Sequence, residues 1–269
     1  MAEIPIHRRK KLNDLAQDIV SQFKFDVEIL PELIAKENDL KFYYDHYGVE
    51  KDGRGFEGLQ IYDGSRFHTH INLDLVWSKD SSRARFAFGH ELGHYFIDEH
   101  HSLLKKRYHP SRFDPKETNL IELEANYFSG ALLMPQQSFR NALFKKKFSF
   151  DLVTDLSGRF KVSELAVILR FIQVGTYPLM IAYCKNGLLE WFDRSDDFPF
   201  KVFKTKVGKE VPSTSVVGEY FRLGNKAKYT DVQTIAVDDW FYYGPADGTL
   251  NEQCFYSDYG YVISLIWPN

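Results

Sequence analysis

The sequence contains few cysteines and no long run of apolar residues. Cys184 and Cys254 are its only cysteines among 269 residues, and they do not have C-x-x-C spacing. This excludes a disulfide framework and a cysteine-based zinc site, and it indicates a reducing compartment. No stretch of the chain approaches the roughly 18 consecutive apolar residues of a membrane-spanning helix, so no membrane association is expected.

A strong charge imbalance is also missing, since the formal net charge is −3. Without a basic excess there is no general electrostatic attraction to nucleic acid or anionic membranes, so direct nucleic-acid binding is not expected. Basic residues run from His7 to Lys11, but the apolar segment of a signal peptide does not follow them. We therefore expect a cytoplasmic protein in which this basic stretch is the solvated face of a helix.

The most informative stretch is Arg83 to His100, RARFAFGHELGHYFIDEH. Its apolar pattern, uninterrupted by proline, predicts a helix over residues 82–99. On a helix, His90 and His94 lie one turn apart on the same face, so both imidazoles can bind one metal ion. In this H-E-x-x-H arrangement Glu91 can act as general base for a water at the metal, which is the chemistry of a metallopeptidase.

Two histidines can also be ordinary hydrogen-bonded residues of a helix, so the metal site depends on a third ligand. A catalytic zinc has three protein ligands and one open position. His100 has the spacing of the last histidine in H-E-x-x-H-x-x-G-x-x-H, but Ile97 occupies the glycine position where that pattern turns. If the helix continues through Ile97, His100 rotates away from the metal face and becomes a surface or loop residue.

A second predicted helix offers a better third ligand. Residues 119–134, NLIELEANYFSGALLM, have an apolar side and are followed by Pro135. Glu122 would complete a group of two histidines and one carboxylate, which is a recognised catalytic zinc site. Asn126, one turn later, can hydrogen-bond to a ligating imidazole. Glu124 is the rival ligand, although its spacing directs it away from the side of Asn126.

The segment before the motif predicts helices and a small sheet. We expect an amphipathic helix from Leu12 to Phe23 and a brief helix that begins at Pro31. Strands are expected near residues 40–44, 59–62 and 67–73. An edge strand just before the motif helix is where a metallopeptidase can hold an extended peptide by backbone pairing.

After the motif we expect a loop from residue 101 to 118 and, beyond Pro135, further helices near 136–144, 151–160 and 163–171. The last two can be interpreted as a helix-turn-helix with Arg170 toward DNA. A simple turn between packed helices is the preferred interpretation, because the basic surface is missing.

Helical periodicity stops near Gly175, which predicts two domains, residues 1–175 and 176–269. Asn186-Gly187 between apolar runs indicates a hairpin, and further strands are expected near residues 234–237, 254–256 and 261–266, with one short helix near 215–222. The fold class is therefore α+β, with a small mixed C-terminal module. Its aromatic residues can form a ligand or peptide surface, or simply belong to the core and the sheet: Trp191, Trp240, Tyr242, Tyr243, Tyr256, Tyr259 and Tyr261.

The two motif helices together resemble the ImmA/IrrE family of metallo-endopeptidases. RFAFGHELGHYFIDEH followed by IELEANYFSGALLMP is similar to the family's R-F-x-x-x-H-E-x-x-H and E-x-x-A-N-x-F-x-x-x-L-L-M-P helices, and VSELAVILR resembles the helix that follows them. The resemblance covers about residues 1–175. The sequence departs from it at Gly89, where alanine is common, and at Ser129-Gly130, which replace an alanine pair.

The resemblance implies a zincin-like metallopeptidase domain, mostly helical with a small sheet, in which Zn²⁺ is bound by His90, His94 and Glu122 and Glu91 is the catalytic base. It also implies a cytoplasmic endopeptidase that cleaves a helix-turn-helix transcriptional repressor in a stress or mobile-element circuit, with a sensory or partner-binding C-terminal module. The alternative is a non-hydrolytic, zinc-containing regulator that binds or sequesters a repressor. Three side chains are candidates for stabilising the oxyanion: Tyr127, His101 and His109.

Overall fold

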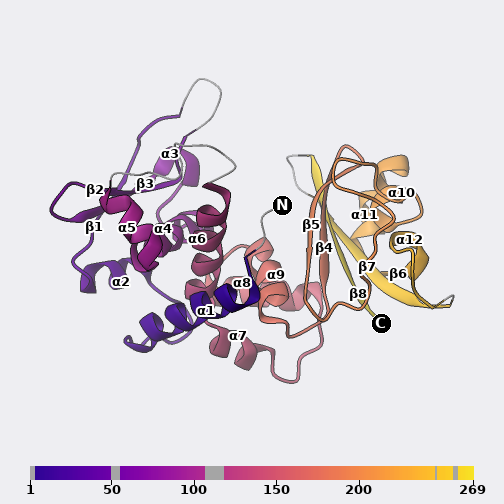
Figure 1. The fold of residues 1–269 in the computed structure, drawn as a ribbon. Coiled ribbons are helices and arrows are strands. Elements are labelled where there is room, and N and C mark those ends of the chain that lie inside the picture. The colour runs from indigo at the N-terminus through magenta and orange to yellow at the C-terminus, as the bar shows by residue number, and fades with distance from the viewer. Residues whose placement is uncertain (1–3, 50–54, 107–117, 246, 257–259) are drawn as a thin grey trace. The chain divides into compact units, whose positions relative to one another are not determined.

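The computed structural model describes residues 4–49, 55–106, 118–245, 247–256 and 260–269 (Figure 1). The chain divides into two compact units, Met1–Val167 and Ile168–Asn269. The first unit is mostly helical with a small sheet, and the second is built on a five-stranded antiparallel sheet, which confirms the predicted α+β class. The division after Val167 lies inside a helix, and the functional domain boundary at residue 175 stays a prediction.

Two helices open the first unit as expected. Helix α1, Ile6–Ser21, buries the apolar face that its periodicity predicts, and it begins earlier than the apolar pattern does. Helix α2, Pro31–Glu37, starts with proline at its first position, where the missing N–H costs nothing.

A three-stranded sheet follows, in the order β1-β3-β2. It consists of β1 (Lys41–Asp45), β2 (Gly58–Tyr62) and β3 (Phe67–Asn72), with β1 parallel and β2 antiparallel to β3. The turn between β2 and β3 is fixed by the Asp63 carboxylate, which accepts hydrogen bonds from the backbone N–H groups of Ser65 and Arg66. The predicted strands are confirmed, and β2 is an edge of the described sheet.

The motif helix is shorter than predicted. After a short helix α3 (Leu73–Val76) that the sequence did not reveal, α4 runs over Ser82–Phe96 and ends at Ile97. Ile97 is extended, with φ −78° and ψ 112°, and its buried side chain belongs to the core. Helix α5, Asp98–Lys105, then begins in a new direction. The predicted helix to residue 99 was therefore wrong beyond Phe96, and the predicted loop from residue 101 was wrong up to Lys105. Residues 107–117 lie outside the described part.

The second motif helix, α6, covers Thr118–Leu133 and packs against α4 and α1. Small residues allow α4 and α6 to approach closely. A Cβ placed on Gly89 would lie 2.6 Å from Ser129 Oγ, and one on Gly93 would lie 3.2 Å from Ala125 Cα. Helices α7 (Gln136–Leu143), α8 (Phe150–Phe160) and α9 (Glu164–Val174) follow as predicted.

The second unit is an antiparallel sheet in the order β5-β4-β8-β7-β6. Its elements are β4 (Met180–Lys185), β5 (Leu188–Arg194), α10 (Val216–Leu223), α11 (Lys226–Thr230), β6 (Gln233–Ala236), α12 (Val237–Trp240), β7 (Thr249–Tyr256) and β8 (Tyr261–Pro268). Asn186 and Gly187 both have positive φ, 52° and 80°, as the predicted hairpin turn requires. Helices α11 and α12 were not expected.

A buried carboxylate organises the interior of this second unit. Glu252 accepts hydrogen bonds from the N–H groups of Val216 and Val217 at the start of α10, from Trp240 Nε1 and from Ser264 Oγ. The aromatic residues of this unit play mixed roles, since Trp240 is fully buried in the core whereas Tyr242 and Tyr243 are exposed. No helix within the described residues has both the length and the apolar character needed to cross a membrane.

Candidate metal centre

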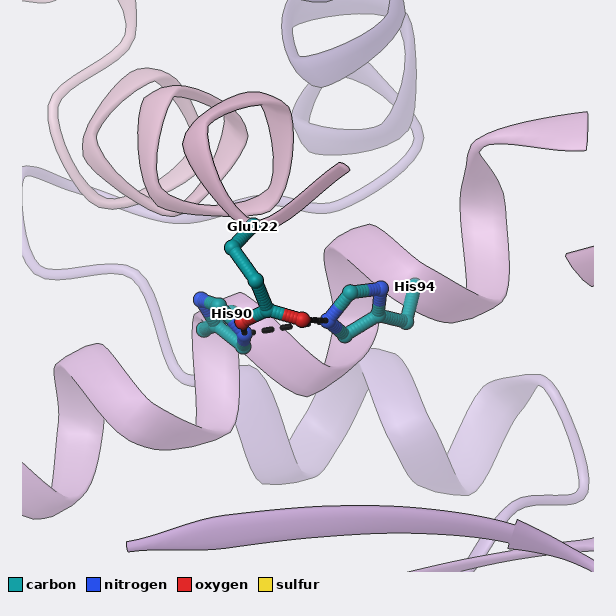
Figure 2. Close-up of side chains that lie close together, drawn as sticks. All are labelled: His90, His94 and Glu122. Atoms are coloured by element: carbon teal, nitrogen blue, oxygen red, sulfur yellow. Dashed lines mark hydrogen bonds and ion pairs between the residues drawn. The ribbon is translucent and has the colours of Figure 1, made fainter. Parts of the chain in front are cut away.

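Helices α4 and α6 bring three side chains together (Figure 2). His90 and His94 project from successive turns of α4, and their Nε2 atoms lie 3.0 Å apart. Glu122 reaches them from α6, with its Oε2 3.1 Å from His90 Nε2 and its Oε1 3.5 Å from His94 Nε2. Within the described ranges, no other group of three histidines, cysteines or acidic residues has ligand atoms close enough to hold one metal ion.

The spacing of these atoms fits zinc. With metal–ligand bonds of about 2.0–2.1 Å and tetrahedral angles, neighbouring ligand atoms are about 3.3 Å apart. The two Nε2 atoms are 3.0 Å apart, and each has a different oxygen of the Glu122 carboxylate beside it, at 3.1 Å from His90 and 3.5 Å from His94, so these contacts lie close to that value. Two imidazoles and one carboxylate also leave a fourth position free, which is the donor pattern of a catalytic rather than a structural zinc site.

His90 is oriented by a second contact from α6. Its Nδ1 lies 2.9 Å from Asn126 Oδ1, so the predicted contact between Asn126 and an imidazole of the cluster is present. A carbonyl oxygen only accepts hydrogen bonds, which puts the ring proton on Nδ1 and leaves the lone pair of Nε2 directed at the cluster. His94 differs, because its buried Nδ1 has no hydrogen-bond partner in the described part of the chain.

Electrostatics keep the carboxylate of Glu122 ionised. Burial raises the pKa of Glu122, but the contacts with His90 and His94 outweigh burial and hold that pKa well below its usual range. Burial lowers the pKa of His90, whereas Glu122 and Glu91 raise it, and the net change is upward. Negative charge is thus concentrated where the two imidazole nitrogens meet, as a divalent cation requires.

The side chain of Glu91 extends from α4 toward the edge strand β2. It is buried, and burial raises the pKa of its carboxyl group, while His90 and His94 act in the opposite direction. Its carboxylate accepts a hydrogen bond from the backbone N–H of Gln60 in β2. Gly58 leaves room for it, because a Cβ at that position would lie 2.7 Å from Glu91 Oε1.

The rival ligands of the sequence lie elsewhere. Glu124 faces away from the cluster, as expected, and binds Arg8 and His100. His100 was predicted to be a surface or loop residue, and this was wrong: it is only 2% exposed and lies in α5. The break at Ile97 carries its ring back to 5.2 Å from the ring of His94, but its Nε2 faces Glu124 and not the three ligand atoms. Burial lowers the pKa of His100 to about 3, so the ring is neutral.

The candidates for oxyanion stabilisation are largely engaged by other partners. The hydroxyl of Tyr127 accepts a hydrogen bond from Asn13 in α1, and His101 Nδ1 lies 2.8 Å from the carbonyl oxygen of Tyr95. His109 lies outside the described residues. Arg170, considered above as a DNA contact, is fully buried, which favours the interpretation of α8 and α9 as packed helices.

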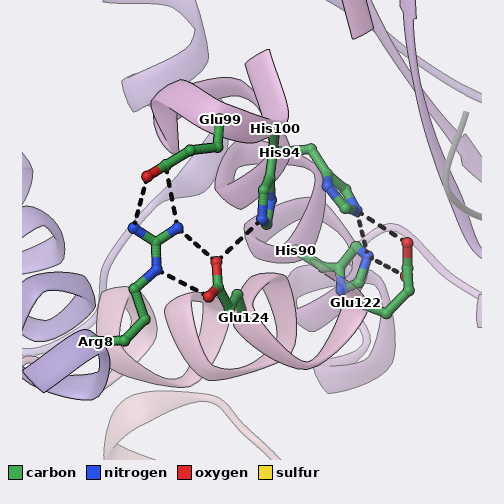
Figure 3. A network of polar contacts seen from close by, with 7 residues as sticks. All are labelled: Arg8, His90, His94, Glu99, His100, Glu122 and Glu124. Atoms are coloured by element: carbon green, nitrogen blue, oxygen red, sulfur yellow. Dashed lines mark hydrogen bonds and ion pairs between the residues drawn. The ribbon is translucent and has the colours of Figure 1, made fainter. Parts of the chain in front are cut away.

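The sequence did not reveal the role of Arg8. The basic stretch His7 to Lys11 was expected to be solvated, but the Arg8 side chain is only 18% exposed and forms ion pairs with Glu99 and Glu124 (Figure 3). The missed signal is that Arg8 lies four residues before the buried Leu12, on the inward face of α1.

Comparisons with known proteins identify a domain that includes this site. Residues 55–171 match the family model of the IrrE N-terminal-like domain, which contains all four predicted site residues. Among solved structures, the chain is similar to a Mycobacterium tuberculosis transcriptional regulator, with a TM-score of 0.63, 15% sequence identity and coverage of 98% of this chain and 81% of that chain. At this identity the similarity shows the fold alone. No curated protein sequence gives a significant match.

Proposed function

We propose that this chain, which belongs to the ImmA/IrrE metallopeptidase family through its IrrE N-terminal-like domain at residues 55–171, is a zinc-dependent endopeptidase. One observation carries the proposal: the Nε2 atoms of His90 and His94 lie 3.0 Å apart, each has an oxygen of the Glu122 carboxylate within 3.5 Å, and the buried residue Glu91 directly follows His90 on α4. A structural zinc site would need a fourth protein ligand and would have no use for an adjacent base.

In the proposed reaction, bound zinc supplies Lewis acidity that polarises the scissile carbonyl and acidifies water. Glu91 takes a proton from the attacking water on its carboxylate and passes it to the nitrogen of the leaving amine. Two features prepare Glu91 for this role. Burial raises the pKa of its carboxyl group, which makes the carboxylate a stronger base, and the Gln60 N–H donates a hydrogen bond to it. Asn126 keeps the His90 ring turned so that Nε2 faces the cluster.

The edge strand β2 is the proposed binding site for an extended peptide. The backbone bonds from Asn72 N to Glu57 O and from Asp63 N to Arg66 O show that odd-numbered residues here face β3. The backbone groups of Gly58, Gln60 and Tyr62 therefore point to the open side, where Gln60 already reaches Glu91. A peptide paired with this edge would pass beside the catalytic base, as predicted for the strand before the motif helix.

The substrate we propose is a helix-turn-helix transcriptional repressor in the cytoplasm, cleaved in a stress or mobile-element circuit. The support is the family resemblance, together with the similarity of the fold to that of a transcriptional regulator. The C-terminal unit is then the candidate for sensing a signal or binding the partner.

The test incubates the zinc-loaded full-length protein with the repressor encoded beside its gene. We expect a repressor fragment with the native protein and none with Glu91→Gln, a substitution that keeps the shape of residue 91 and all three metal ligands. Zinc content, measured on both proteins, serves as the control and should be equal. Cleavage by Glu91→Gln at the native rate would refute the assignment of the base. Zinc and repressor binding without any cleavage would instead favour a non-hydrolytic regulator that sequesters its target.

A further inference from the structure

A second polar cluster lies beside the candidate metal centre and contributes no ligand atom to it. We call it the Arg8 network: Arg8 from α1, Glu99 and His100 from α5, and Glu124 from α6 (Figure 3). It exists because α4 stops at Ile97, so that α5 turns back and places His100 in the interior.

The two histidines of the metal centre are held in different ways. His90 has a hydrogen bond from Nδ1 to Asn126, the kind of outer contact that fixes the ring of most metal-binding histidines. His94 Nδ1 is buried and, in the part of the chain that the structure describes, has no such partner. The orientation of the His94 ring therefore depends on what packs against it. Two rings pack against it: that of His90, at a centroid distance of 4.7 Å, and that of His100, at 5.2 Å with an interplanar angle of 43°. His100 is the one of the two that lies outside the metal centre.

His100 is in turn fixed by a carboxylate. Its Nε2 lies 3.2 Å from Glu124 Oε2, and both side chains are almost fully buried. Glu124 is two residues after Glu122 on α6, so it points to the α1 and α5 side while Glu122 points to the metal centre. A buried carboxylate keeps one position when hydrogen bonds, a positive charge or both hold it there.

Arg8 provides both. Its Nε donates to Glu124 Oε1 at 2.8 Å and its Nη2 donates to Oε2 at 2.6 Å, a two-pronged contact. The same guanidinium donates to Glu99 at 3.0 and 3.1 Å. One side chain of α1 thus joins the two helices on which His100 and Glu122 are carried.

We propose that Arg8 is a positioning residue of the metal centre, which fixes the His94 imidazole through Glu124 and His100. The inference rests on the proposed function, because it assumes that His94 binds the metal. Without Arg8, Glu124 would remain buried without its counter-charge, so it would turn toward water or reorganise α5, and His100 would lose its anchor. The His94 ring would then be free to rotate away from the direction set by Glu122.

The experiment compares full-length Arg8→Ala with Lys11→Ala, which removes one positive charge from an exposed position of the same helix. Zinc affinity is measured by competition with a chromophoric chelator, and the geometry of the centre by the visible absorption of the Co²⁺-loaded protein. We expect Arg8→Ala to bind zinc about 10- to 100-fold more weakly, the usual effect of losing an outer contact of a metal ligand, and to show an altered Co²⁺ spectrum. Lys11→Ala should match the native protein in both.

Further variants separate positioning from folding. Arg8→Lys keeps the charge but not the two-pronged geometry, so it should recover the thermal stability of the metal-free protein more fully than the zinc affinity. Glu124→Gln keeps the size and shape of the side chain but removes the charge that pairs with Arg8, so it should weaken zinc binding as Arg8→Ala does. If Arg8→Ala fails to fold, Glu124→Gln decides by the same two measurements.

The outcomes distinguish this inference from the proposed function. Variants that are less stable but keep native zinc affinity and a native Co²⁺ spectrum would overturn the positioning role and leave the peptidase proposal intact. A native protein that binds no zinc would overturn both.

Discussion

Replacing Gly89 by alanine should destabilise the contact between α4 and α6, and replacing Ser129 by alanine should restore it. A Cβ on Gly89 would lie 2.6 Å from Ser129 Oγ, far inside van der Waals contact, but 3.4 Å from Ser129 Cβ, which is ordinary contact. The Ser129 hydroxyl cannot simply rotate away, because it is buried and donates to the carbonyl oxygen of Phe86 at 2.8 Å. The clash is therefore with one atom that one substitution removes.

The expected magnitudes follow from these contacts. Overpacking costs about 1–3 kcal/mol, and alanine regains about 0.8–1.0 kcal/mol over glycine inside a helix, so Gly89→Ala should lose up to about 2 kcal/mol, and about 1 kcal/mol for the middle of the overpacking range. Ser129→Ala should lose about 0.5–1.5 kcal/mol with its hydrogen bond. The double variant keeps the helix gain without the clash and should be near the native stability, which gives a coupling energy of about 2 kcal/mol.

Urea unfolding of the metal-free proteins, followed by hydrogen exchange of peptides from α4 and α6, measures these differences within the first unit. Gly158→Ala in α8 is the matched control, since a Cβ there would meet nothing within 4 Å, and it should be neutral or stabilising. Additive losses in the double variant, or a Gly89→Ala protein as stable as the native one, would refute the reasoning.

Three further results are expected. His94→Ala and Glu122→Ala should each abolish stoichiometric zinc binding, because each removes one of three ligands. Metal analysis after dialysis measures this, and retention of zinc by both variants would refute the ligand assignment. Gly58→Ala should keep its zinc but lose activity by about 10-fold or more, measured as kcat, since its Cβ would displace the Glu91 carboxylate; native kcat would contradict this. Glu252→Gln should lower the free energy of unfolding of the second unit by about 1–3 kcal/mol, because the NH₂ group of the amide would face hydrogen-bond donors. Urea unfolding measures this, and an unchanged free energy would contradict it.

The parts of the structure that the sequence predicted are those set by local spacing. His90 and His94 share one face of a helix because they are four residues apart, and Glu122 with Asn126 forms a polar pair on a largely apolar helix, so the cluster could be expected before any fold was known. The hairpin at Asn186-Gly187 is equally local, because both residues tolerate positive φ.

The parts that the sequence did not predict depend on burial. Ile97 ends α4 without glycine or proline, because an extended conformation places its side chain in the core. No local signal marks such a choice, since isoleucine is also compatible with a helix. Because the helix was predicted to continue through Ile97, His100 was placed at the surface, and the ion pairs of Arg8 were not predicted. Long-range ion pairs of this kind appear only when three separate helices are in place.

The candidate ligands on α4 and the small residues with which α4 contacts α6 repeat at the same interval of four residues. Gly89 and Gly93 each precede a histidine of the cluster, so the face of α4 that touches α6 lies one residue, about 100°, from the face that carries the ligands. Small residues on the first face bring the two backbones close enough for Glu122 to reach both Nε2 atoms. Glycine at position 89 and serine at position 129, where the family resemblance has alanines, then compensate one another: one side loses a methyl group and the other gains a hydroxyl. The separation of α4 and α6 is thereby maintained. This separation, as much as the identity of the three side chains, keeps the Glu122 carboxylate within 3.5 Å of both Nε2 atoms.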